Sequence, residues 1–198
     1  MTYPEEDQVQ EVFNDSPEVL RRAIAQRDAL AQWQAQQLKK LETQLKARCT
    51  ASMNLTWSID AAQPYKKQSH FSLAFPSNDG VFMRVEWFWG YAKESDLYWG
   101  VYAPTLGLEE SKSLSAALRK YLELSNTAMP LQEQAEAGWP LWTLIGEDPL
   151  FAAQDRTLNA GADVVHPWLS VDRDRGNDFV SLILQRYELL NTCLLQIT

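Results

Sequence analysis

The sequence predicts an α+β fold in which a long N-terminal helix precedes a four-stranded antiparallel meander sheet, with C-terminal helices packed on that sheet. Three observations support this fold: residues 18–49 contain neither Gly nor Pro, apolar and polar residues alternate from 53 to 102, and the C-terminal segment is rich in leucine. The chain has 198 residues, of which 45% are hydrophobic, which is enough for one domain with its own core. We therefore expect an acidic N-terminal tail over residues 1–15 and a single domain over residues 16–198.

The long helix has a clear start signal. Ser16 is a good N-cap, Pro17 suits the first helical position, and Glu18 interacts favourably with the positive end of the helix dipole. Apolar residues then recur at spacings of three to five: Leu30, Trp33, Leu38, Leu41 and Leu45. A helix of about 30 residues is longer than the usual ~12, so we expect it either to break near Arg27 or to project and pack on a partner.

Four runs with a period of two predict the strands of the meander. These runs are residues 55–59, 71–75, 81–89 and 98–102. Residues 76–80 form a strong turn signal between the second and third runs, because the Asp79-Gly80 pair accepts positive φ. Residues 90–96 form the loop between the third and fourth runs.

The second half of the chain is less regular. Its pattern predicts a helix from Ser111 or Ser113 to about residue 126 and a final helix that begins near residue 177. Between them lies the aromatic segment Gly138-Trp-Pro-Leu-Trp142, which we expect to be buried as a loop or a short helix.

Composition excludes several classes of protein. Two cysteines, Cys49 and Cys193, are too few for a disulfide framework or a cysteine-rich zinc site. The sequence holds no Gly-rich phosphate-binding loop and no run of 18 apolar residues that could span a membrane. The acidic N-terminus does not resemble a signal peptide, so we expect a cytoplasmic location.

Charge is distributed unevenly along the chain. The net charge is −8, which argues against non-specific coating of nucleic acid. Residues 1–18 carry six acidic residues and no Lys or Arg, whereas residues 19–48 carry seven basic and two acidic residues. Arg27, Lys39 and Lys46 are the candidate basic helix surface. The basic residues wrap around the helix, which favours a solvated surface or pairing with the acidic tail over direct binding of nucleic acid.

No complete catalytic constellation is found. The two histidines, His70 and His166, lie in no catalytic motif, and we expect them to be ordinary, partly buried residues. Carboxylates that could hold a metal occur at Glu86 and within residues 172–178. We expect Glu86 to make a cross-strand or diagonal ion pair on a solvated sheet face, and the loop 172–178 to cap the last helix. The sequence thus predicts no catalytic residue, no cofactor and no metal.

Aromatic residues suggest a binding surface instead. Burying Trp87, Trp89 and Trp99 against the helices leaves the neighbouring side chains on the opposite sheet face, either as a second buried layer or as an exposed patch. Aromatic side chains are frequent energetic centres of protein interfaces. An acidic stretch, Glu133, Glu136, Glu147 and Asp148, would add carboxylates to such a surface. The candidate binding surface comprises Phe88, Tyr91, Tyr98, Tyr102, Glu133 and Glu136.

The order of several motifs resembles a known group. A helix reading AQWQAQQLKKLETQL precedes a meander whose last strand reads DLYWGVYAP, followed by GWPLW and a Leu-rich helix. This resembles the C-terminal, non-catalytic part of PD-(D/E)xK nuclease-superfamily proteins of bacteria and phages. In that superfamily an Asp and a strand Glu-x-Lys hold the metal. Here Glu86-Trp87-Phe88 has no Lys at the required place, so the resemblance transfers no catalytic residue.

These observations predict a non-enzymatic protein-binding module or inhibitor of bacterial or phage origin. Its partner would belong to a nucleic-acid-handling complex of antiviral defence or counter-defence, contacted through the acidic and aromatic surface. Two alternatives stay open: a degenerate metal-dependent nuclease and a protein that binds nucleic acid directly. We expect a protein partner and no membrane.

Overall fold

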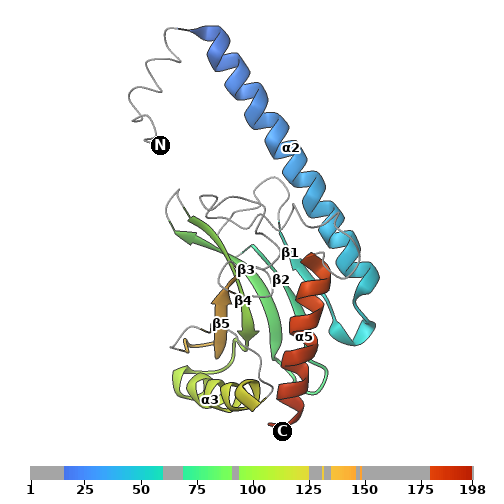
Figure 1. Cartoon of the computed structure of the whole chain (residues 1–198), viewed down its shortest axis with the longest axis vertical. Helices are drawn as coiled ribbons and strands as arrows, with labels where there is room; N and C mark the ends of the chain where they lie inside the picture. The colour runs from blue at the N-terminus through green and yellow to red at the C-terminus, as the bar shows by residue number, and fades with distance from the viewer. Residues whose placement is uncertain are drawn as a thin grey trace.

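A five-stranded antiparallel sheet in the order β1-β2-β3-β4-β5 forms the centre of the structure (Figure 1). The structure is a computed structural model, and it describes residues 16–59, 69–90, 94–124, 131, 135–145, 148 and 179–197, without the side chains of 30–31, 34, 87–90 and 94–97. The strands are β1 (Thr56–Ser58), β2 (His70–Ala74), β3 (Phe82–Gly90), β4 (Glu94–Tyr102) and β5 (Leu141–Leu144). The helices are α2 (Pro17–Arg48), the short 3₁₀ helix η1 (Ala51–Met53), α3 (Leu108–Leu124) and α5 (Phe179–Leu195).

The α+β class and the antiparallel sheet are confirmed, but the prediction of four strands is wrong. The additional strand, β5, pairs with β4 and places Trp142 opposite Gly100. The expected loop or short helix over residues 138–142 is therefore wrong from Leu141 onward. A strand of four residues directly after Pro140 offers too few alternations to be recognised, and its partner strand lies far back in the sequence.

The two central hairpins follow the predicted turns. Between β2 and β3, Gly80 has a φ of +75°, and the Val81 amide donates to the Asn78 carbonyl at 3.1 Å. Asp79-Gly80 thus supplies the left-handed conformation that this turn requires. The β3–β4 hairpin is longer than expected, because β3 runs to Gly90 and β4 begins at Glu94.

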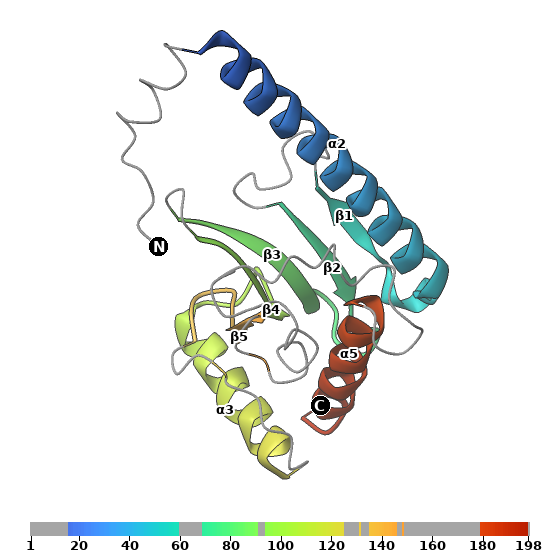
Figure 2. The same cartoon turned by 45° about the horizontal axis from the view of Figure 1, so that its top comes forward.

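Helix α2 is uninterrupted, so the expected break near Arg27 does not occur. Among its described side chains, burial begins only at Gln37, after which Leu38, Leu41 and Leu45 are almost fully buried. The N-terminal half projects beyond the other described elements (Figures 1 and 2). Trp33 does not join the buried stripe and is 36% exposed, because it lies about 140° around the helix from Leu38.

The three long helices pack against one face of the sheet. On β2 and at its end, the Tyr187 hydroxyl of α5 donates to the Ala74 carbonyl at 2.8 Å, and its ring stacks on Phe75 with centroids 5.0 Å apart. Arg48 of α2 donates to Ser181 of α5 at 2.6 Å, and α3 contacts both α5 and β5. The sheet side chains in this core are Phe71, Leu73, Met83, Val85, Trp99, Val101 and Leu141.

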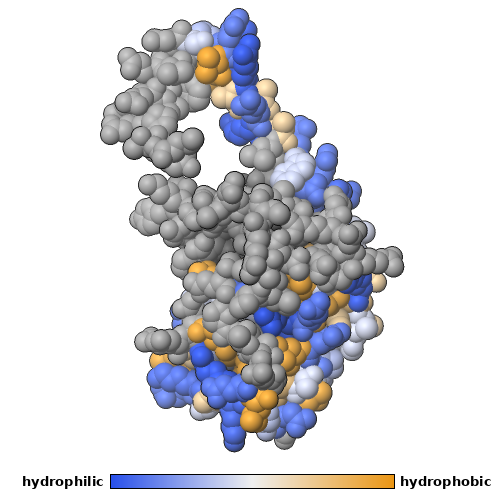
Figure 3. Space-filling view, in the orientation of Figure 1, coloured by the Kyte–Doolittle hydropathy of each residue, from blue (hydrophilic) through white to orange (hydrophobic). Residues whose placement is uncertain are grey.

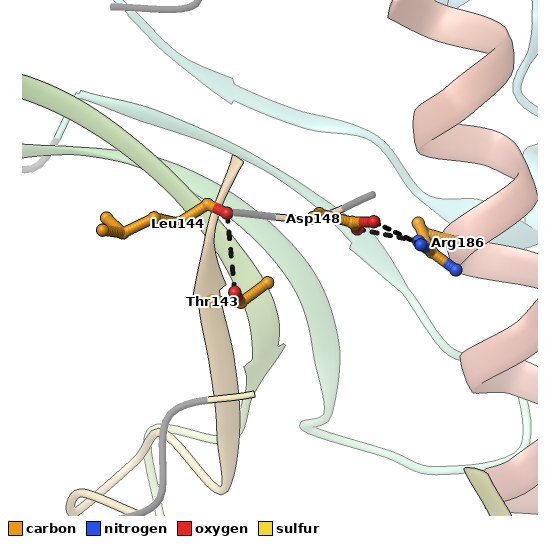
Figure 4. Close-up of polar contacts among 4 residues, drawn as sticks. All are labelled: Thr143, Leu144, Asp148 and Arg186. Atoms are coloured by element: carbon orange, nitrogen blue, oxygen red, sulfur yellow. Dashed lines mark hydrogen bonds and ion pairs between the residues drawn. The ribbon is translucent and has the colours of Figure 1, made fainter. Parts of the chain in front are cut away.

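A buried ion pair crosses this core (Figure 4). Asp148, just after β5, is fully buried, and Arg186 of α5 is 6% exposed. Nε of Arg186 donates to Oδ2 of Asp148 at 2.8 Å, while a second guanidinium nitrogen donates to Oδ1. The Arg186 guanidinium also lies 5.8 Å from the ring centroid of Trp99. A bidentate pair of this kind fixes the end of β5 relative to α5.

Candidate functional site

The face of the sheet that points away from the helices carries polar and aromatic side chains in adjacent rows. In one row, His70 of β2 lies opposite Glu86 of β3, which lies opposite Tyr98 of β4. In the next row, Arg84 lies opposite Gly100. We call this surface, with the two tryptophans that contact it, the aromatic face; its members are His70, Arg84, Glu86, Tyr98, Tyr102, Trp139 and Trp142.

Arg84 is the centre of the aromatic face. Its Nε lies 2.6 Å from Oε2 of Glu86 as an ion pair, although this N–H is not aligned for a hydrogen bond. Its NH2 lies 2.9 Å from Nδ1 of His70, which must accept because a guanidinium has no acceptor. The guanidinium carbon lies 4.2 Å from the ring centroid of Tyr102 and 5.9 Å from that of Trp139. These contacts fix the orientation of the Arg84 guanidinium.

The expected solvated ion pair at Glu86 is wrong in two respects. The partner, Arg84, is two residues away on the same strand, and the two residues are only 8% and 9% exposed. Alternation alone could not reveal this burial, because an Arg and a Glu on one strand face usually indicate contact with water. Within the aromatic face, Glu86 is occupied by Arg84 and by the Tyr98 hydroxyl.

Tyr98 is held as a neutral phenol. Burial raises the pKa of its hydroxyl well above the ordinary value of 10.0, and the negative charge of Glu86 and the hydrogen bond to that carboxylate raise it further. Arg84 opposes this shift, but its effect is smaller. Tyr98 therefore acts here as a donor to Glu86 and not as an acid that releases its proton near neutral pH.

Two tryptophans pack against the tyrosines of β4. The Trp139 ring lies 5.0 Å from Tyr98 and 4.9 Å from Tyr102 between centroids, and the Trp142 ring lies 5.9 Å from Tyr98. Tilted and edge-to-face geometries of this kind are favourable for aromatic pairs. All four side chains are half-buried. The second aromatic layer that the sequence allowed is therefore present, with its outer edge accessible to solvent.

A tight turn over residues 136–139 positions Trp139 at this surface. The Trp139 amide donates to the Glu136 carbonyl at 2.9 Å, and Gly138 between them has a φ of +75°. The Gly138 amide donates to the Leu106 carbonyl at 3.0 Å and lies 3.2 Å from the Ser111 hydroxyl. The turn is thereby anchored to the start of α3, and exposed Glu136 lies at the rim of the aromatic face.

Gly100 creates the space in which the strands meet. A Cβ at this position would lie 2.1 Å from the Leu141 carbonyl oxygen and 2.7 Å from Cα of Trp142. These are backbone atoms, so no rotamer change could relieve the clash. The glycine thus allows β5 to approach β4 and to present Trp142 beside Tyr98.

The structure brings together three of the predicted binding residues. Tyr98 and Tyr102 contact Trp139, and Glu136 precedes it in the same turn. Tyr91, Glu133 and the side chain of Phe88 lie outside the described residues, as do residues 1–15, His166 and the loop 172–178. Trp139 and Trp142 were not predicted as members of this surface, although the two aromatic residues in GWPLW were a signal.

The predicted basic helix surface is not a continuous stripe. Arg27, Lys39 and Lys46 are all exposed on α2. Arg27 pairs with Asp28 at 2.9 Å and Lys46 pairs with Glu42. Arg27 and Lys39 are twelve residues apart, which places them about 120° apart around the helix. This geometry agrees with the expectation that basic residues wrap around α2.

No candidate metal centre occurs within the described ranges, since no three His, Cys, Asp or Glu residues there converge. Among the same residues no helix is long and apolar enough to cross a membrane. Comparison with protein-family models, curated proteins and solved structures found no match. The resemblance to the PD-(D/E)xK nuclease superfamily therefore stays a prediction.

Proposed function

We propose that this chain is a non-enzymatic protein-binding module whose docking surface is the aromatic face. The observation that carries this proposal is the gathering of Tyr98, Tyr102 and Glu136 around Trp139. Half-buried aromatic rings next to a charged rim are the usual composition of an interface centre.

The rigidity of this surface supports the proposal. Arg84 is held by Glu86, by His70 and by the Tyr102 ring, and the Trp139 turn is anchored to α3. Side chains that are already fixed lose little conformational entropy when a partner binds. Aromatic rings that are buried on one side and accessible on the other can therefore contribute most of their contact energy to binding.

The charge of the molecule indicates the chemistry of the partner. The chain carries a net charge of −8, and Glu136 lies exposed beside the tyrosine and tryptophan rings. Lysine and arginine side chains interact favourably with both carboxylates and aromatic faces. The partner we propose is accordingly a protein with a basic surface. More specifically, we propose that the partner is a nucleic-acid-handling enzyme that this chain inhibits.

The test is capture of proteins from a bacterial lysate by the tagged chain and by two variants. Trp139→Ser removes the central ring, and Glu136→Lys reverses the rim charge without touching the core. Leu124→Ser and Glu123→Lys, both at the exposed end of α3, are the matched controls. We expect one protein that both site variants lose and both controls retain, with capture falling steeply as salt rises.

Equal capture by site and control variants would contradict the proposal. So would hydrolysis of DNA with magnesium or manganese that is lost in Glu86→Gln, because that result would assign Glu86 to catalysis. Circular dichroism of each variant confirms that lost capture does not reflect unfolding.

A further inference from the structure

The projecting half of α2 carries an apolar stripe that the described fold leaves uncovered. Leu20 and Ile24 are 38% and 41% exposed, although leucine and isoleucine are usually buried. Leu20 lies eighteen residues, or about five turns, before Leu38, so both point to the same side of the helix. Figure 3 shows hydrophobic and hydrophilic residues mixed along this half. Leu20 and Ile24 thus lie on the side of α2 whose C-terminal part, from Leu38 to Leu45, packs on the core.

Two basic residues, Arg21 and Arg27, lie beside the uncovered part of the stripe, whereas Arg22 lies on the far side of the helix, about 200° around from Leu20. Arg21, Arg22 and Arg27 outnumber the two acidic residues between positions 17 and 36. Arg27 lies seven residues from Leu20, which places it close to the line of the stripe. Because Arg27 also pairs with Asp28, this face carries only a small excess of positive charge, and an occupant that offers apolar side chains together with carboxylates fits it.

Residues 1–15 have this composition and end where α2 begins. They hold five acidic residues, Glu5, Glu6, Asp7, Glu11 and Asp15, and neither Lys nor Arg. Val9, Val12 and Phe13 are spaced so that a helical conformation would place all three on one side. Asn14, Asp15 and Ser16 favour chain reversal.

We propose that residues 1–15 dock antiparallel on the projecting half of α2 and cover the Leu20–Ile24 stripe. If the chain reverses at residues 14–16 and runs back along α2, Val9 lies beside the segment between Leu20 and Ile24. Glu5 and Glu6 then lie within about one helical turn of Arg27. The direct covalent link gives the segment a high effective concentration at this face, so weak contacts suffice for binding.

A second copy of α2 is a poorer occupant. Two such helices would bring Arg21 and Arg27 of one chain towards the same arginines of the other, and like charges at an interface are unfavourable. Arg27 would also enter the apolar seam of both copies. The acidic segment offers the opposite charge at the same positions.

The experiment measures hydrogen exchange of the α2 amides in the full chain. The variant Glu5→Lys/Glu6→Lys/Asp7→Lys breaks the proposed charge pairing, and we expect peptides within residues 17–30 to exchange about fivefold to tenfold faster. Adding Arg21→Glu/Arg22→Glu/Arg27→Glu restores opposite charges and should restore protection. The double-mutant cycle removes the intrinsic effect of each triple change on helix stability.

The control is Asp79→Lys/Glu123→Lys/Glu188→Lys, which changes the net charge equally at exposed positions outside α2. It should leave exchange in residues 17–30 unchanged, and 1 M salt should remove the difference between wild type and the tail variant. Unchanged exchange in the tail variant would overturn the proposal, as would failure of the charge swap to restore protection. Protection that rises with protein concentration, with a dimer in sedimentation, would also overturn it in favour of a second copy.

Discussion

In and beside the aromatic face, single residues act through their effect on the strands and side chains around them. Gly100 contributes the absence of a side chain, which allows β5 to approach β4. Tyr98 contributes a hydrogen-bond donor, because its half-buried hydroxyl stays protonated and donates to Glu86. Neither role is visible in the residue type alone, since both depend on a strand or side chain that is distant in sequence.

Gly100→Ala should destabilise the protein by about 1–3 kcal/mol or more, because the new methyl group meets backbone atoms of β5. Gly107→Ala is the matched control, since a Cβ there would come no closer than 3.7 Å to the nearest atom, an oxygen of Glu110. Urea unfolding followed by tryptophan fluorescence measures both. Equal losses of stability in the two variants would show that the close approach of β4 and β5 is not the cause.

Tyr98→Phe should reduce the fall in the free energy of unfolding that occurs as pH rises above about 9. In the unfolded chain Tyr98 releases its proton near its ordinary pKa of 10.0, whereas in the folded chain its pKa is raised. Above about pH 10 the unfolded state therefore binds fewer protons than the folded state, and stability falls as pH rises. The variant lacks this dependence, so the free energy of unfolding should decline less between pH 9 and pH 11. Parallel curves for wild type and variant would contradict the assignment.

At the scale of elements, the sequence predicts helices and strands that are specified by local signals better than strands that are specified by long-range pairing. Helix α2 and the β2–β3 hairpin were predictable, because Ser16, Pro17 and the Asp79-Gly80 turn act within a few residues. β5 was missed, since a four-residue strand is specified mainly by its pairing with β4. The burial of Glu86 was missed for a similar reason: it depends on contacts that only the assembled sheet provides.

The link between β5 and α5 depends on the buried ion pair of Asp148 and Arg186. Asp148→Asn should cost about 3–5 kcal/mol, because it leaves the Arg186 guanidinium buried without its counter-charge. The double variant Asp148→Leu/Arg186→Met removes both charges and should recover most of that loss. Chemical denaturation of the three proteins measures the coupling. A double variant less stable than Asp148→Asn would mean that the pair has a specific structural role that apolar packing cannot replace.

At the scale of the whole molecule, one continuous helix passes through two regions that differ in burial. The C-terminal half of α2 belongs to the main core through Leu38, Leu41 and Leu45, whereas the described side chains of its first half lie outside that core. The sequence left open whether the helix breaks near Arg27 or projects, and it placed Trp33 in the apolar stripe. Among the described side chains the boundary lies near Gln37, and it depends on the tertiary contacts of α2, which are a property of the assembled fold.

This division predicts different effects of two chemically identical changes on one helix. Leu41→Ala should lower the global free energy of unfolding by about 2–5 kcal/mol, because it opens a cavity in the main core. Leu20→Ala should leave global unfolding nearly unchanged and instead increase hydrogen exchange within residues 17–30, since the projecting half can unfold locally while the core stays folded. Urea unfolding and exchange measured on the same samples separate the two effects. A global loss in Leu20→Ala as large as that in Leu41→Ala would mean that α2 unfolds as one cooperative unit with the sheet, and that its projecting half is part of the main core after all.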